Sequence, residues 1–144
     1  MEAIEDVITN AYVETERIFI EKKKIETFEE RTNSYLDKIL ELTEDFNKLN
    51  TLYESVNFEM ERTISSSSDT TYLTRLIKLS KPLIESSIKL YSSVRKSKYY
   101  PGMKSTIKKY HDETDNFREL ITDMKLKIKL ISGNHFTEIL RRAS

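Results

Sequence analysis

The feature that most constrains this chain is an apolar stripe between Ser34 and Ile64. Its members recur at alternating steps of four and three residues: Tyr35, Ile39, Leu42, Phe46, Leu49, Tyr53, Val56 and Met60. This spacing places them all on one face of an α-helix. The stretch contains no Gly and no Pro, so no residue in it breaks a helix. The sequence predicts a long helix here whose apolar side is buried against partner helices.

The composition favours an all-α fold. The 144 residues include two Gly and two Pro, too few for the many turns of a sheet protein. Charged residues make up 33% of the chain and hydrophobic residues 38%, which suits narrow apolar seams beside a wide solvated surface. We therefore predict a single domain over residues 1–144, an antiparallel four-helix bundle with coiled-coil-like heptad seams.

Further apolar stripes and turn residues divide the chain into segments. The stripe of the third segment consists of Leu73, Leu76, Ser80, Leu83, Ser87, Tyr91 and Val94, with Ile77, Ile84 and Ile88 beside it. The stripe of the fourth consists of Met103, Ile107, Tyr110, Thr114, Phe117, Ile121, Met124, Ile128 and Ile131. Ser-rich and Pro-Gly turns precede the third and fourth helices, and Ser132-Gly133-Asn134 predicts a stop before a short C-terminal helix. Within the third helix, Pro82 either kinks the helix or starts a new one. The run Met124–Leu130 alternates as in a strand, but the helical period around it predicts helix. The expected helices span residues 3–31, 34–64, 69–98 and 103–132, with the short helix after them.

The boundary at residues 30–34 leaves two structures open. Asn33 can end a helix in the left-handed conformation and Ser34 can cap the next one, which predicts a chain reversal. The heptad step nevertheless continues from Phe28 to Tyr35, as in one helix of about 60 residues and roughly 90 Å. We favour the reversal, because it gives four segments of similar length, as an antiparallel bundle requires.

The first segment contains two glutamates, Glu14 and Glu21, at positions where its stripe calls for an apolar residue. An ionised carboxylate is too costly to bury without a partner. We expect the carboxylates to stay in water while the stripe shifts sideways, onto Ile8, Thr15, Phe19 and the aliphatic stem of Lys22.

The charges are unevenly distributed along the chain. Residues 1–64 carry 8 basic and 16 acidic side chains, whereas residues 65–144 carry 16 basic and 8 acidic ones. One interpretation is that the two halves pack together and neutralise each other, since flanking charges set the pairing of helices. The other is that a charged face recruits a partner.

The strongest concentration of positive charge surrounds the predicted turn at Pro101-Gly102. From Thr70 to His111 there are ten basic residues and one acidic residue, Glu85. Interleaved basic and aromatic side chains suit an acidic protein surface, nucleic acid or anionic lipid. We predict a partner-binding tip within residues 95–109, and its candidate residues are Arg95, Lys96, Lys98, Tyr99, Tyr100 and Lys104.

Signs of catalysis or cofactor binding are missing from the sequence. Without Cys, thiolate chemistry and disulfides are excluded. His111 and His135 form no Glu-x-x-His pair, and there is no Gly-rich phosphate loop. We expect no catalytic residues, no metal and no cofactor. The acidic N-terminal stretch and the lack of a long apolar run predict a cytoplasmic protein without integral membrane association.

These patterns favour a non-catalytic protein that binds a partner protein and blocks or scaffolds it, as immunity proteins, antitoxins and adaptors do. The partner is expected to carry an acidic surface, and heptad seams are also compatible with a homodimer. The alternative is a nucleic-acid-binding helical module that uses the basic tip. Helical bundles serve many functions, so the fold alone does not choose between them.

Reversing Lys96, Lys98 and Lys104 to Glu tests the tip. The thermal midpoint should stay nearly unchanged, because surface ion pairs contribute at most about 1 kcal/mol each. Partner association should slow and binding should weaken. Early melting of the triple variant would identify the tip as an internal neutralising contact. Normal melting with unchanged binding would place the docking site elsewhere.

Overall fold

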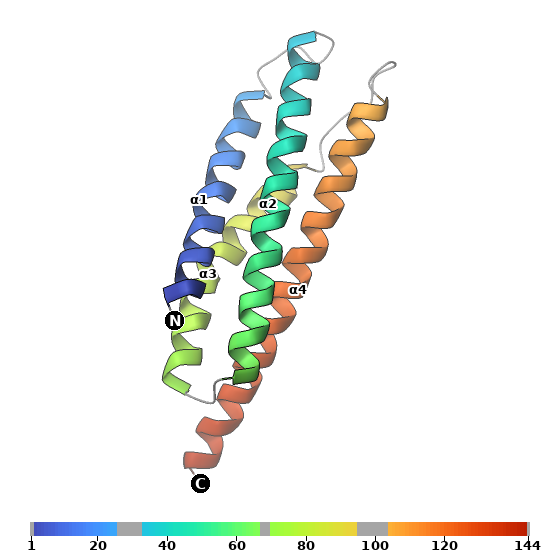
Figure 1. Cartoon of the computed structure of the whole chain (residues 1–144). Coiled ribbons are helices and arrows are strands. Elements are labelled where there is room, and N and C mark those ends of the chain that lie inside the picture. The colour runs from blue at the N-terminus through green and yellow to red at the C-terminus, as the bar shows by residue number, and fades with distance from the viewer. Residues whose placement is uncertain (1, 26–32, 67–69, 95–103, 144) are drawn as a thin grey trace.

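Four α-helices make up the part of the chain that the computed structural model describes (Figure 1), and no strand occurs within these ranges. Side chains are described for residues 4–25, 36–65, 71–94 and 105–131. The predicted all-α fold with four helices is confirmed. The helices are α1 (Glu2–Ile25), α2 (Asn33–Ser66), α3 (Thr70–Val94) and α4 (Lys104–Ala143).

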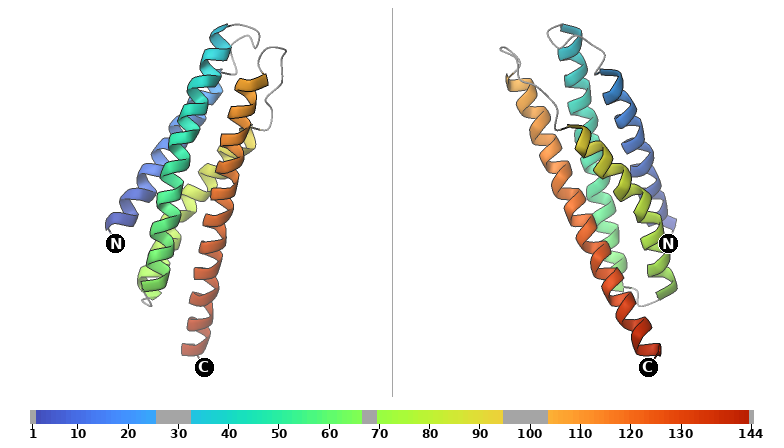
Figure 2. Two further views of the ribbon diagram at one scale, coloured as in Figure 1. Left: turned by 45° about the vertical axis from the view of Figure 1, so that its right-hand side comes forward. Right: turned by 180° about the vertical axis from the view of Figure 1, so that it is seen from behind.

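Consecutive helices run in opposite directions, as predicted, and form two hairpins, α1/α2 and α3/α4 (Figures 1 and 2). The hairpins pack with α1 against α3 and α2 against α4. Helices α2 and α3 therefore lie diagonally opposite each other in the bundle. Contacts of α1 with α3 join residues 70 apart, as between Glu16 and Ser86. Contacts of α2 with α4 recur at a separation of 63 residues, at Asn50 and at Asn57. Constant separations mean that these neighbouring helices are parallel.

The chain reversal between the first two helices is confirmed. Helix α1 ends at Ile25, α2 begins at Asn33, and the two lie side by side. A single helix of about 60 residues is therefore excluded. Residues 26–32 lie outside the described residues, whereas Asn33 and Ser34, to which we assigned the cap chemistry, are the first two residues of α2.

The core forms where the stripes predicted it. Every predicted stripe residue of α2 from Ile39 to Met60 is buried, and α4 buries its own stripe from Ile107 onward apart from Ile128, which is half-buried. The rings of Phe46 and Phe117 meet edge to face with centroids 5.6 Å apart. Aromatic edges and faces attract in this arrangement, beyond the effect of burial itself. The spacing of the buried residues is thus confirmed, while a supercoiled heptad seam stays a prediction.

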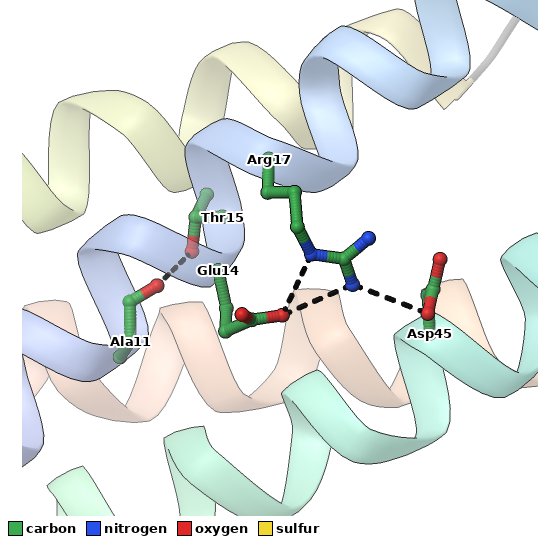
Figure 3. Close-up of polar contacts among 5 residues, drawn as sticks. All are labelled: Ala11, Glu14, Thr15, Arg17 and Asp45. Carbon is green, nitrogen blue, oxygen red and sulfur yellow. Dashed lines mark hydrogen bonds and ion pairs between the residues drawn. The ribbon is translucent and has the colours of Figure 1, made fainter.

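The sideways shift of the α1 stripe is also confirmed. Ile8, Thr15 and Lys22 are buried, and Phe19 is partly buried against the core. The carboxylate of Glu14 remains at the surface, where Arg17 contacts it at 3.0 Å and also reaches Asp45 of α2 at 3.2 Å (Figure 3).

The buried side of α3 matches the predicted stripe except at two positions. Leu90 is buried, whereas Tyr91 and Leu73, which we assigned to the stripe, are half-buried. Helix α3 continues through Pro82 and bends along its length (Figure 2). Proline removes one backbone donor and bends a helix without having to end it. The buried residues keep steps of four and three across Pro82, so the same side of α3 faces the core before and after the bend; they are Leu76, Ser80, Leu83, Ser87, Leu90 and Val94.

The prediction of a stop at Ser132-Gly133-Asn134 and a separate short helix was wrong. Helix α4 runs without a break to Ala143 and extends past the end of the bundle (Figure 1). One Gly costs a helix only about 1 kcal/mol relative to Ala. No Pro follows to prevent continuation, and the residues after Asn134 are mostly compatible with helix.

Replacing Phe46 or Phe117 by Ala should lower the free energy of unfolding by roughly 3–5 kcal/mol, because each ring is fully buried and would leave a cavity. Urea denaturation measures the loss. Leu40→Ala is the control, since Leu40 is 43% exposed and should lose less than about 1 kcal/mol. Losses that small at both phenylalanines would contradict the packing of α2 against α4.

Candidate functional site

The predicted basic tip cannot be placed from the described side chains. Residues 95–103 lie outside the described residues, and Lys104 begins α4 without a described side chain. The flanking helix ends, Val94 and Lys104, lie toward the end of the bundle at which α1 ends and α2 begins (Figure 1). The tip, with all six of its candidate residues, therefore stays a prediction.

A different surface lies among the described side chains, an open groove between α3 and α4 with a volume of about 480 Å³. Its lining is more apolar than polar. We call it the α3/α4 groove, and it is lined by Ile84, Thr122, Lys125, Leu126, Ile128 and Lys129.

Helix α4 supplies the basic rim of this groove. Thr122, Lys125 and Lys129 follow one another at steps of three and four, so they share one side of the helix. Residues 117, 124 and 131 on the core side are buried. Leu126 lines the groove and is 56% exposed, and Leu130 one turn further is 60% exposed. Both leucines belong to the alternating run Met124–Leu130, in which a helix must turn some apolar residues outward.

Helix α3 supplies an apolar rim. Ile77, Ile84, Ile88 and Tyr91 recur at steps of seven, four and three, which places them on one side of the helix. Ile88 is 41% exposed, and the other three are partly buried against the core. Sequence analysis had placed the isoleucines beside the α3 stripe. It could not show that they face α4, because that depends on which helices are neighbours.

The lysines of the groove are not neutralised within the described structure. No carboxylate is among the described residues that line the groove, and neither Lys125 nor Lys129 forms an ion pair with a described residue. A described ion pair between the acidic and basic halves joins Glu5 and Arg75 at 3.0 Å. The interpretation that the halves neutralise each other therefore does not extend to this groove.

A second, more polar pocket of about 440 Å³ lies between α2 and α4. Its Glu113 carboxylate accepts hydrogen bonds from the side-chain amides of Asn47, at 3.1 Å, and Asn50, at 3.0 Å. Asn50 also donates to the backbone carbonyl of Glu113 at 2.9 Å. Because these bonds hold the carboxylate against α2, we assign this cluster to helix pairing rather than to ligand binding.

A polar contact lies in the centre of the core, at the hydroxyl of Tyr53. It forms a hydrogen bond with the hydroxyl of Thr15 at 2.7 Å. The Thr15 hydroxyl in turn donates to the Ala11 carbonyl at 2.6 Å, as Figure 3 shows. Tyr53 is therefore the donor to Thr15. Burial raises the pKa of Tyr53 to about 12, and hydrogen bonds with Ser87 and Thr15 oppose this shift in part. At neutral pH the phenol stays protonated and serves as a structural link.

We also searched the described residues for a metal site and a membrane-spanning helix. No group of three or more His, Asp or Glu side chains among them could hold a metal ion. His111 is half-buried with its ring 5.9 Å from that of Tyr110. None of the helices, over the residues described, is long and apolar enough to cross a membrane.

Comparison with known proteins found no match to the chain among family models, curated proteins or solved structures. Function must therefore be argued from the surfaces described above.

Replacing Tyr53 by Phe should make stability less sensitive to alkaline pH. Because the folded-state pKa is about 12 and that of an unfolded tyrosine about 10, the wild-type phenol stabilises the fold fully below pH 10. That contribution, about 3 kcal/mol for two pKa units, is lost as the pH rises through 12. Urea denaturation at pH 8, 10 and 11 measures the difference between the two proteins.

Tyr12→Phe controls for the substitution, since Tyr12 is 37% exposed. A Tyr53→Phe variant that loses stability with pH as steeply as wild type would contradict the buried position of this hydroxyl.

Proposed function

We propose that this chain is a non-catalytic protein–protein interaction module that binds a partner protein and blocks or scaffolds it. Immunity-like, antitoxin-like and adaptor roles in the cytoplasm all fit this class. The observation that carries the proposal is the α3/α4 groove, where exposed apolar side chains adjoin lysines without a described ion-pair partner. Exposed apolar patches with a polar rim commonly mark interaction sites.

Physical considerations support a protein partner. Leu126 and Leu130 gain nothing from facing water, but they would stabilise an interface by being buried. Lys125 and Lys129 would steer an acidic surface toward the groove and fix its orientation. A nucleic acid would use the lysines but would leave the aliphatic side chains largely unused, since it binds through phosphate contacts and aromatic stacking.

Reversing Lys125 and Lys129 to Glu should abolish the capture of a specific protein from a nuclease-treated lysate of the native source. Mass spectrometry identifies the protein that wild type retains. The thermal midpoint should hardly change, because exposed charges contribute at most about 1 kcal/mol each.

The matched control reverses Lys38 and Lys48 of α2 to Glu. This variant has the same net charge as the groove variant, but neither of its substitutions is at a residue that lines the groove. This variant should still capture the partner. If nuclease treatment removes all specific capture, the nucleic-acid alternative replaces our proposal. If both double variants lose capture equally, net charge rather than the groove governs binding.

A further inference from the structure

We propose that the α3/α4 groove binds an amphipathic helix of another protein, one that carries an acidic stripe beside its apolar stripe. This inference rests on the proposed function and specifies the partner. It follows from three properties of the groove: its shape, the distribution of its apolar side chains and the position of its cations.

The shape favours a helix over an extended peptide. An extended peptide usually binds by adding a strand to a sheet edge, and the described ranges contain no strand to extend. Two packed helices leave a straight groove along their seam, into which a third helix can place its side chains at a separation of about 8–10 Å. The groove residues Ile84 and Leu126 lie on opposite sides of such a seam.

The apolar side chains favour an amphipathic occupant. Ile84 of α3 and Leu126 of α4 line the groove. The exposed Ile88 follows Ile84 by one turn of α3, and the exposed Leu130 follows Leu126 by one turn of α4, so apolar side chains continue beyond the groove lining. Each pair repeats at the spacing with which a docked helix would present its own apolar residues. The remaining side of the docked helix would face water, so it must be polar.

The cations favour an acidic partner and fix its orientation around its own axis. Lys125 and Lys129 lie on α4, and Arg118 precedes them on the same helical side at a distance of seven residues from Lys125. On the opposite rim, α3 contributes the aliphatic side chain of Ile84 to the lining, so both lysines that line the groove lie on α4. A helix with one apolar stripe and an adjacent stripe of Glu or Asp would match both rims at once.

A concave seam with cations along one rim is a poor match for a lipid surface, which is flat and would meet both rims with the same headgroups. A second copy of this chain is also disfavoured. Its acidic first half would have to meet the groove in a head-to-tail contact, which forms open filaments unless the rotation closes a ring. Both alternatives are outcomes of the test below.

The test uses two synthetic helical peptides of about 20 residues, long enough to form a helix once docked. They share one Leu stripe and differ in the flanking residues, which are Glu in one peptide and Lys in the other. Fluorescence anisotropy measures the binding of each peptide to the full chain. We expect the Glu peptide to bind at least tenfold more tightly than the Lys peptide.

Variants of the full chain locate the binding site. Leu126→Asp should weaken binding of the Glu peptide at least tenfold. Phe58→Asp, at a residue of α2 that is 65% exposed, should leave it unchanged. In the Lys125→Glu/Lys129→Glu variant the preference should reverse, so that the Lys peptide binds more tightly.

Several results would overturn the inference. These are equal binding of the two peptides, equal weakening by Leu126→Asp and Phe58→Asp, and stronger binding to phosphatidylserine vesicles than to the Glu peptide.

A wild-type dimer in sedimentation that Leu126→Asp dissociates would assign the groove to a second copy. If the groove lysines are needed for capture from a lysate but the Glu peptide does not bind, the helical partner is wrong and the proposed function stands. If the Glu peptide does not bind and the groove lysines are also not needed for capture from a lysate, both this inference and the proposed function are wrong.

Discussion

The hydroxyl of Tyr53 is the point on which the four helices converge. From α2 it donates to Thr15 of α1 at 2.7 Å, Ser87 of α3 contributes to its electrostatic environment, and its ring centroid lies 4.9 Å from that of Phe117 on α4. A buried hydroxyl without partners would be costly, so the surrounding helices must approach in the one arrangement that satisfies it. The apolar stripes supply most of the driving force for collapse, whereas this contact restricts how the collapsed helices can be arranged.

The asparagines of α2 impose a similar restriction along the length of α2 and α4. Asn50 and Asn57 lie seven residues apart and donate to the carbonyls of Glu113 and Leu120, which are also seven apart. Their own carbonyl oxygens are buried without a hydrogen-bond partner in the described structure. A shift of α4 by one turn would remove both donors from their acceptors and leave two buried amides unsatisfied. Polar residues in a helical seam often determine register in this way.

Much of this fold could be predicted from the sequence, because a stripe such as Ile39–Met60 depends only on local spacing and sterics. The continuation of α4 through Gly133 could not, because a local cost of about 1 kcal/mol does not decide where a long helix ends. The groove was beyond prediction for a different reason. The off-stripe residues Leu126 and Ile84 are visible in the sequence, but whether they line one groove depends on helix order. That order is set by long-range contacts such as those of Tyr53 and Asn57, whose partners are 38 and 63 residues away.

The parallel packing of α1 with α3 and of α2 with α4 relates the two hairpins by a translation rather than by a twofold axis. The first hairpin has helices of 24 and 34 residues and the second has helices of 25 and 40 residues. Units that stack by translation do not close on themselves, which is how solenoid proteins grow and why their last unit needs a cap. The two hairpins of this chain therefore leave the outer seam of the second one, between α3 and α4, without a further packed helix among the described residues.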